Sequence, residues 1–77
     1  MTLKRALNPI PPYVREALAA GGLTAAFEAR PPFQRNDYLD WITRARKEET
    51  RRKRLAQMLD ELEEGDIYMK MRWTPSA

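Results

Sequence analysis

Paired prolines and glycines divide the chain into short segments, and their spacing constrains the fold more than any other feature of the sequence. Proline suits the first turn of a helix, where its missing N–H would be unpaired anyway, and glycine closes a helix by adopting a left-handed conformation cheaply. The dividing residues are Pro11–Pro12, Gly21–Gly22, Pro31–Pro32 and Gly65. We therefore predict an all-α fold, a small bundle of four short helices with an extended C-terminal tail.

Apolar spacing supports each predicted helix. Pro12 opens the first helix, Thr24 caps the short second helix AAFEA, and Pro32 opens the third. Residues 46–54 contain no apolar side chain, so a continuous rod would expose more than two turns, and we expect a break near Lys47 and Glu48. The residues expected to be buried in the third and fourth helices are Tyr38, Leu39, Trp41, Ile42, Ala45, Leu55, Met58, Leu59 and Leu62. The predicted organisation is an extended arm over residues 1–10, a helical domain over 11–65 and a tail over 66–77.

The charge pattern of the fourth helix is unusual. Glu48 and Glu49 complement the positive end of the helix dipole and stand four residues before Arg52 and Lys53, which favours ion pairs. The far end, DELEEGD, is acidic, which is the reverse of what the dipole favours. We therefore expect an interaction outside the helix to favour the basic cluster.

The tail DIYMKMRW alternates with strand period, placing Ile67, Met69, Met71 and Trp73 on one side. The chain offers no convincing second strand, unless the arm TLKRAL supplies one. A lone strand must pair with a neighbour, lie on the helices or stay disordered. Those four residues are accordingly the candidates for self-association, in a homodimer for example.

Composition limits the chemistry. The chain has no cysteine and no histidine, so the usual ligands for zinc or haem are missing, and we expect no cofactor, no metal and no catalysis. The first twelve residues lack an apolar stretch long enough for a signal peptide, and no segment approaches the roughly 20 apolar residues of a membrane span. We expect a soluble, cytoplasmic protein.

The stretch from Pro31 to Gly65 resembles the C-terminal domain of the bacterial YdeI or OmpD-associated family, also called bacteriocin-protection proteins. The residues that carry the resemblance are Pro31, Pro32, Tyr38, Leu39, Trp41, Ile42, Ala45, Arg46, Thr50, Arg51, Arg54, Leu55 and Gly65. The upstream segment PPYVREALAAGGLTAAFEA is also similar, so the resemblance covers residues 9–65. It implies a helical domain and a link to envelope stress or antimicrobial-peptide tolerance, but no reaction.

Seven of the eleven residues in RARKEETRRKR, residues 44–54, are basic. With the aromatic residues before them they form the candidate surface for an anionic partner: Arg44, Arg51, Arg52, Lys53, Arg54, Tyr38 and Trp41. Arginine matches phosphate and carboxylate bidentately and aromatic rings offer stacking faces, so the partner is a protein or a polyanion, nucleic acid included. The alternative is structural: Arg51 lies across Trp41 or pairs with Asp37 or Asp40, and the other basic side chains form a solvated face.

Overall fold

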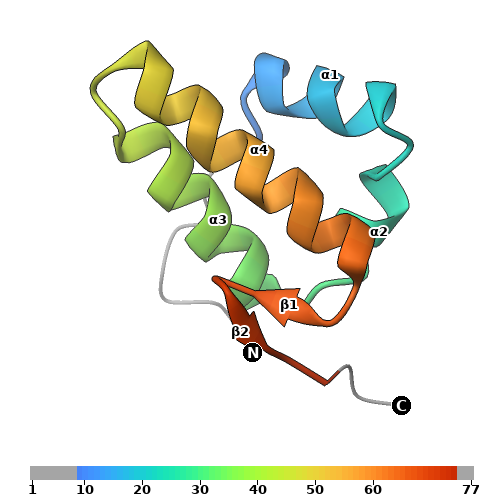
Figure 1. Cartoon of the computed structure of the whole chain (residues 1–77). Helices are drawn as coiled ribbons and strands as arrows, with labels where there is room; N and C mark the ends of the chain where they lie inside the picture. The colour runs from blue at the N-terminus through green and yellow to red at the C-terminus, as the bar shows by residue number, and fades with distance from the viewer. Residues whose placement is uncertain (1–8, 75–77) are drawn as a thin grey trace, which may run out of the picture.

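The computed structural model describes residues 9–74, which form four helices followed by a small hairpin (Figure 1). The helices are α1 (Pro12–Ala20), α2 (Thr24–Glu28), α3 (Pro32–Arg44) and α4 (Glu48–Glu64). The hairpin strands are β1 (Ile67–Tyr68) and β2 (Met71–Arg72). The predicted helical bundle with an extended C-terminal segment is confirmed. Within residues 9–74 no helix has the length and apolar character needed to cross a membrane.

The proline and glycine signals fix the helix boundaries where they were expected. Pro12 and Pro32 occupy the first turns of α1 and α3, and Gly65 closes α4 with a φ of 86°. The break between α3 and α4 also falls where the sequence predicts it, since α4 begins at Glu48 after Lys47. One detail differs: Thr24 does not cap α2 from outside but is its first helical residue, after Leu23.

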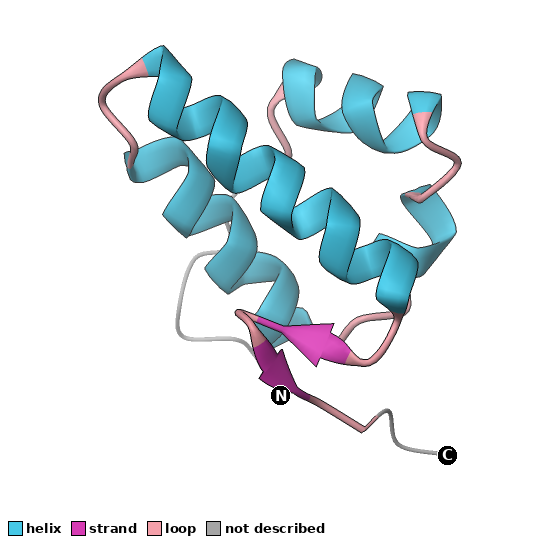
Figure 2. Cartoon of the chain, viewed as in Figure 1, coloured by secondary structure: helices cyan, strands magenta, loops and turns pink. Residues whose placement is uncertain are grey.

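Helices α3 and α4 form an antiparallel pair, and in the view of Figure 1 α1 and α2 lie on the other side of α4 (Figures 1 and 2). Every helix contributes to one core, because each has an apolar stripe to bury. The buried members are Val14, Leu18, Leu23, Phe27, Tyr38, Leu39, Ile42, Met58 and Leu62. Tyr68 and Met69 of the hairpin pack against this core, so the hairpin is part of the folded domain.

The tail differs from the single alternating strand that its sequence predicts. It folds back on itself, pairing Ile67 with Arg72 and Tyr68 with Met71 in antiparallel register. Met69 and Lys70 form the turn with φ values of 50° and 65°, a conformation that turns of this kind usually reserve for glycine or asparagine. The strand that the arm TLKRAL could have supplied lies outside the described residues.

A buried carboxylate explains why the turn forms without glycine. Glu61 on α4 accepts hydrogen bonds from the backbone N–H groups of Met69 and Lys70, both at 2.9 Å. The same carboxylate accepts hydrogen bonds from the Tyr38 hydroxyl and, at 3.0 Å, from Gln57 Nε2. Glu61 is only 5% exposed, so these donors stand in for the water that the charge has lost.

Arg30 supplies a cation at the acidic end of α4. It is 4% exposed and donates to the Glu61 carbonyl at 3.0 Å and to Gln34 Oε1 at 3.1 Å. Its guanidinium also lies over the Trp73 ring at 4.6 Å. A positive charge beside the last carbonyls of a helix is favourable, so Arg30 offsets part of the unfavourable charge order predicted for α4.

Candidate binding site at the corner between α3 and α4

The turn from α3 to α4 gathers the basic residues of the segment 44–54. Since the two helices run antiparallel, the last turn of α3 and the first turns of α4 meet at one end of the bundle (Figure 1). We call the resulting group the basic corner. Its members are Arg44, Arg46, Lys47, Arg51, Arg52, Lys53 and Arg54.

Three cations of the basic corner pair with carboxylates one helical turn away. Arg52 lies 2.8 Å from Glu48 and Lys53 lies 3.7 Å from Glu49, as the four-residue spacing predicts. Arg44 pairs with Asp40 at 3.0 Å on α3. All three cationic side chains are exposed, so each pair stabilises the fold by only about 0 to 1 kcal/mol. The pairing nevertheless lowers the charge that these side chains present to a partner.

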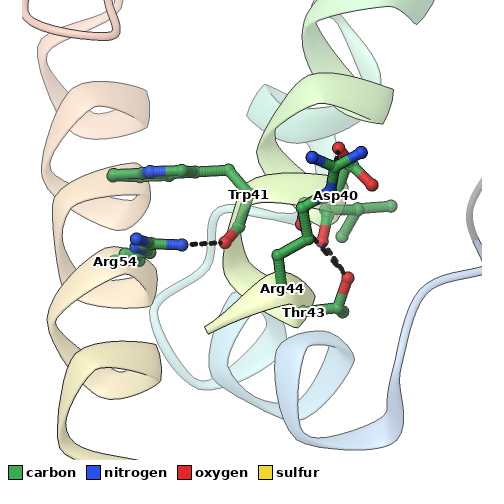
Figure 3. Close-up of polar contacts among 6 residues, drawn as sticks. Asp40, Trp41, Thr43, Arg44 and Arg54 are labelled. Carbon is green, nitrogen blue, oxygen red and sulfur yellow. Dashed lines mark hydrogen bonds and ion pairs between the residues drawn. The ribbon is translucent and has the colours of Figure 1, made fainter. Parts of the chain in front are cut away.

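Arg54 joins the two helices. The Cζ atom of its guanidinium lies 5.2 Å from the centre of the Trp41 ring. The same guanidinium donates a hydrogen bond to the Trp41 carbonyl at 2.7 Å (Figure 3). That carbonyl lies in the last turn of α3, where helices have no backbone donor for it. The arginine that packs on Trp41 is therefore Arg54, whereas the structural alternative from the sequence had assigned this position to Arg51.

Arg51 points elsewhere. It is half-buried and lines a cleft of about 520 Å³ together with Tyr13 of α1 and with Glu48, Arg52 and Leu55 of α4. Its Nε is buried and has no hydrogen-bond partner, and within residues 9–74 no carboxylate forms an ion pair with its side chain. Neither suggested acid is free for it, because Asp40 holds Arg44 and Asp37 accepts from the Tyr68 hydroxyl at 2.6 Å.

Tyr38 does not belong to the basic corner. Its side chain is fully buried in the core, and its hydroxyl donates to Glu61, toward the hairpin. Burial raises the pKa of Tyr38, and the hydrogen bond to Glu61 raises it further. Burial and the hydrogen bond to Asp37 likewise raise the pKa of Tyr68. These phenols stabilise the join between α3, α4 and the hairpin, and neither contacts the cleft.

The structure does not gather the four self-association candidates on one face. Ile67, Met69 and Trp73 are half-buried, whereas Met71 is 59% exposed. Phe33, at the start of α3, is also exposed and makes an edge contact with Tyr68, the strand partner of Met71. Of the four predicted residues, Met71 is therefore the one that the hairpin leaves exposed.

Sequence reasoning missed three residues that matter to these sites. Glu61 falls on the buried stripe of α4, three residues after Met58, and an acid at such a position is a signal that was available. Arg30 stands just before the Pro31–Pro32 pair, and nothing in its sequence position signals that it is buried. Tyr13, one residue before the buried Val14, is 40% exposed and forms a wall of the cleft. Among residues 9–74 no three acidic side chains lie close enough together to hold a metal ion.

Comparison with known proteins identifies a family. Residues 9–65, more than half of the 77, match the family described as "Bacteriocin-protection, YdeI or OmpD-Associated". No curated protein and no solved structure matches the chain. The matched region ends at Gly65, so it contains all four helices and the basic corner but not the hairpin. The chain belongs to the bacteriocin-protection, YdeI or OmpD-associated family.

Proposed function

We infer that this chain is a non-enzymatic binding domain that uses the basic corner to hold an anionic partner. The process it serves is proposed from the family description alone: protection against bacteriocins or a related envelope stress. A binding role is also favoured by the composition, because a chain without histidine or cysteine lacks the side chains most often used in acid–base and nucleophilic catalysis.

The observation that carries this proposal is the difference between the arginines of the basic corner. Arg54 is engaged with Trp41, and Arg44 and Arg52 each have a carboxylate. Arg51 has no such contact among the described residues and lines a cleft of about 520 Å³. A half-buried guanidinium without an ion pair or a hydrogen bond at Nε in its own fold is well suited to meet a charge on another molecule.

Column retention tests the proposal. The wild-type chain and the double variant Arg51→Gln with Lys47→Gln are applied to immobilised heparin and to immobilised poly-L-glutamate, and the salt concentration needed for elution is measured. Each lost ionic contact lowers the affinity for a polyanion, and less salt is then needed to release the protein. The variant should therefore elute at lower salt from at least one matrix. Equal elution of both proteins from both matrices would contradict the proposal.

A control variant guards against a general charge effect. Lys70→Gln with Arg72→Gln removes the same net charge from two exposed residues of the hairpin, which lies at the opposite end of α3 and α4 from the basic corner (Figure 1). If this control lowers the elution salt as much as the corner variant, retention reports overall charge and the corner is not the binding surface.

Nucleic acid remains the alternative anionic partner. The exposed charges of Arg52 and Lys53 favour it, although each is offset by a carboxylate four residues earlier. Contacts of that kind would be made to phosphates and would give binding that falls steeply with salt and shows no sequence preference. Electrophoretic mobility shifts with two unrelated duplexes of equal length distinguish this case from a protein partner.

A further inference from the structure

The cleft beside Arg51 combines one unneutralised cation with apolar walls. Tyr13 approaches from the first turn of α1, and Leu55 from α4, where it also packs on the core. Glu48 lies in the same cleft, but it accepts a hydrogen bond from Arg52 at 2.8 Å and the pair is locally neutral. The charge left over in the cleft is that of Arg51.

The buried Nε of Arg51 is the second observation. A buried N–H without an acceptor is rare in proteins, because the lost hydration is not replaced. Arginine binds carboxylates through pairs of parallel N–H groups, and Nε is a member of one such pair. A small movement of the guanidinium toward the cleft would let an incoming carboxylate satisfy Nε and a terminal nitrogen together.

We propose that this cleft binds a short acidic peptide segment of a protein partner, in which an aspartate or glutamate side chain pairs with Arg51 and a neighbouring apolar side chain rests between Tyr13 and Leu55. The inference rests on the proposed function and names the class of partner. It makes Arg51 the binding residue for the acid and Tyr13 part of the apolar seat.

The walls favour a peptide over a phosphate chain. Nucleic acid is held by a row of cations that follows its backbone, but the cleft presents one uncompensated cation flanked by the carboxylate of Glu48. The apolar side chain of a peptide removes Tyr13 and Leu55 surface from water, which a ribose–phosphate backbone does far less well. A peptide with an acidic residue next to an apolar one matches both the charge of Arg51 and the apolar walls beside it.

A displayed library of random dodecapeptides, selected on the immobilised full chain, tests the inference. Selected peptides should carry an acidic residue within two positions of leucine, phenylalanine or tryptophan. The most enriched peptide is then synthesised with a fluorophore, and its Kd is measured by anisotropy. Loss of a charge-assisted bidentate contact in Arg51→Gln should weaken binding roughly tenfold or more.

Lys53→Gln is the matched control, because it removes the same charge two residues further along α4 from a side chain that does not line the cleft. It should change Kd by less than about threefold, as expected for an exposed, already paired cation. Tyr13→Ser should weaken binding of the selected peptide. It should not weaken binding of a second peptide in which the apolar residue is replaced by serine. Selection of no peptide, selection of peptides without acids, or equal weakening by Arg51→Gln and Lys53→Gln would each overturn the inference.

The column experiment separates this outcome from failure of the proposed function. If the chain is retained on heparin or poly-L-glutamate through the basic corner, and peptide binding is insensitive to Arg51→Gln, the proposed function stands and the cleft assignment fails. If the corner variant elutes like the wild type and no peptide is selected, both fail.

Discussion

Replacement of Glu61 by alanine should destabilise this domain far more than replacement of an exposed acid on α4. Four donors lose their acceptor at once: the Tyr38 hydroxyl, Gln57 Nε2 and the backbone N–H groups of Met69 and Lys70. The Tyr38 hydroxyl lies in the core, where water cannot replace the lost carboxylate. The other three groups are only partly buried, so water can reach them once the hairpin loosens.

The magnitude follows from these two environments. One fully buried donor without an acceptor costs about 1 to 3 kcal/mol, and each hydrogen bond to a charged group contributes about 1.5 to 3 kcal/mol before water compensates. We therefore expect Glu61→Ala to lower the free energy of unfolding by about 3 to 5 kcal/mol, the range found when one member of a buried charged network is removed. Glu61→Gln keeps one acceptor oxygen and should cost about 1 to 2 kcal/mol.

Urea unfolding followed by circular dichroism measures both variants. Glu63→Ala is the control, since Glu63 is an exposed acid on the same turn of α4 and should change stability by no more than about 0.5 kcal/mol. Hydrogen exchange adds a local readout, because the amides of Met69 and Lys70 should lose protection in Glu61→Gln while the α3 amides keep theirs. A Glu61→Ala protein as stable as Glu63→Ala would refute the assigned role.

Three further predictions concern the hairpin and the tyrosines Tyr38 and Tyr68. The raised pKa values of Tyr38 and Tyr68 mean that the unfolded chain loses these protons first, so the contribution of the two tyrosines to stability should be constant below the ordinary tyrosine pKa of 10.0 and fall as the pH rises above it. Urea midpoints at pH 8 and at pH 10.5 check this, and equal midpoints would count against it. Deleting residues 66–77 should lower the urea midpoint, because it uncovers Arg30 and removes the donors that face the buried carboxylate; an unchanged midpoint would mean that the hairpin is not part of the folded unit. Met71→Lys replaces the most exposed apolar side chain of the hairpin, so it should weaken the predicted self-association. Sedimentation velocity measures the oligomeric state, and a wild-type chain that sediments as a monomer would contradict the prediction.

Local chemistry explains which parts of the fold could be predicted. The starts of α1 and α3 depend on the fixed φ of Pro12 and Pro32, and the end of α4 depends on the left-handed conformation at Gly65, so each boundary is encoded within a few residues. The break before Glu48 follows from the absence of apolar side chains in residues 46–54, which leaves a continuous helix nothing to bury there. The ion pairs of Arg52 and Lys53 are equally local, since they depend only on helical spacing.

The parts that the sequence did not predict depend on contacts between distant residues. The hairpin turn contains no glycine or asparagine, so the local sequence does not predict it. Its conformation is supported instead by Glu61, which lies eight residues before Met69 on α4. The roles of Arg51 and Arg54 could not be separated, since both match the family pattern and stand three residues apart. Only the rotation of α4 against α3 decides that Arg54 meets Trp41 while Arg51 meets the cleft.

The distinction between these two arginines is the central claim, and paired stability measurements test it without knowledge of any ligand. Arg54→Gln removes a hydrogen bond to a helix-terminal carbonyl and a cation–π contact, so the free energy of unfolding should fall by about 1 to 2 kcal/mol. Arg51→Gln keeps most of the side-chain stem and removes a guanidinium without a partner, so stability should stay within about 0.5 kcal/mol of the wild type or rise. A loss for Arg51→Gln as large as that for Arg54→Gln would show that both arginines stabilise the fold, and would contradict the assignment of Arg51 to binding.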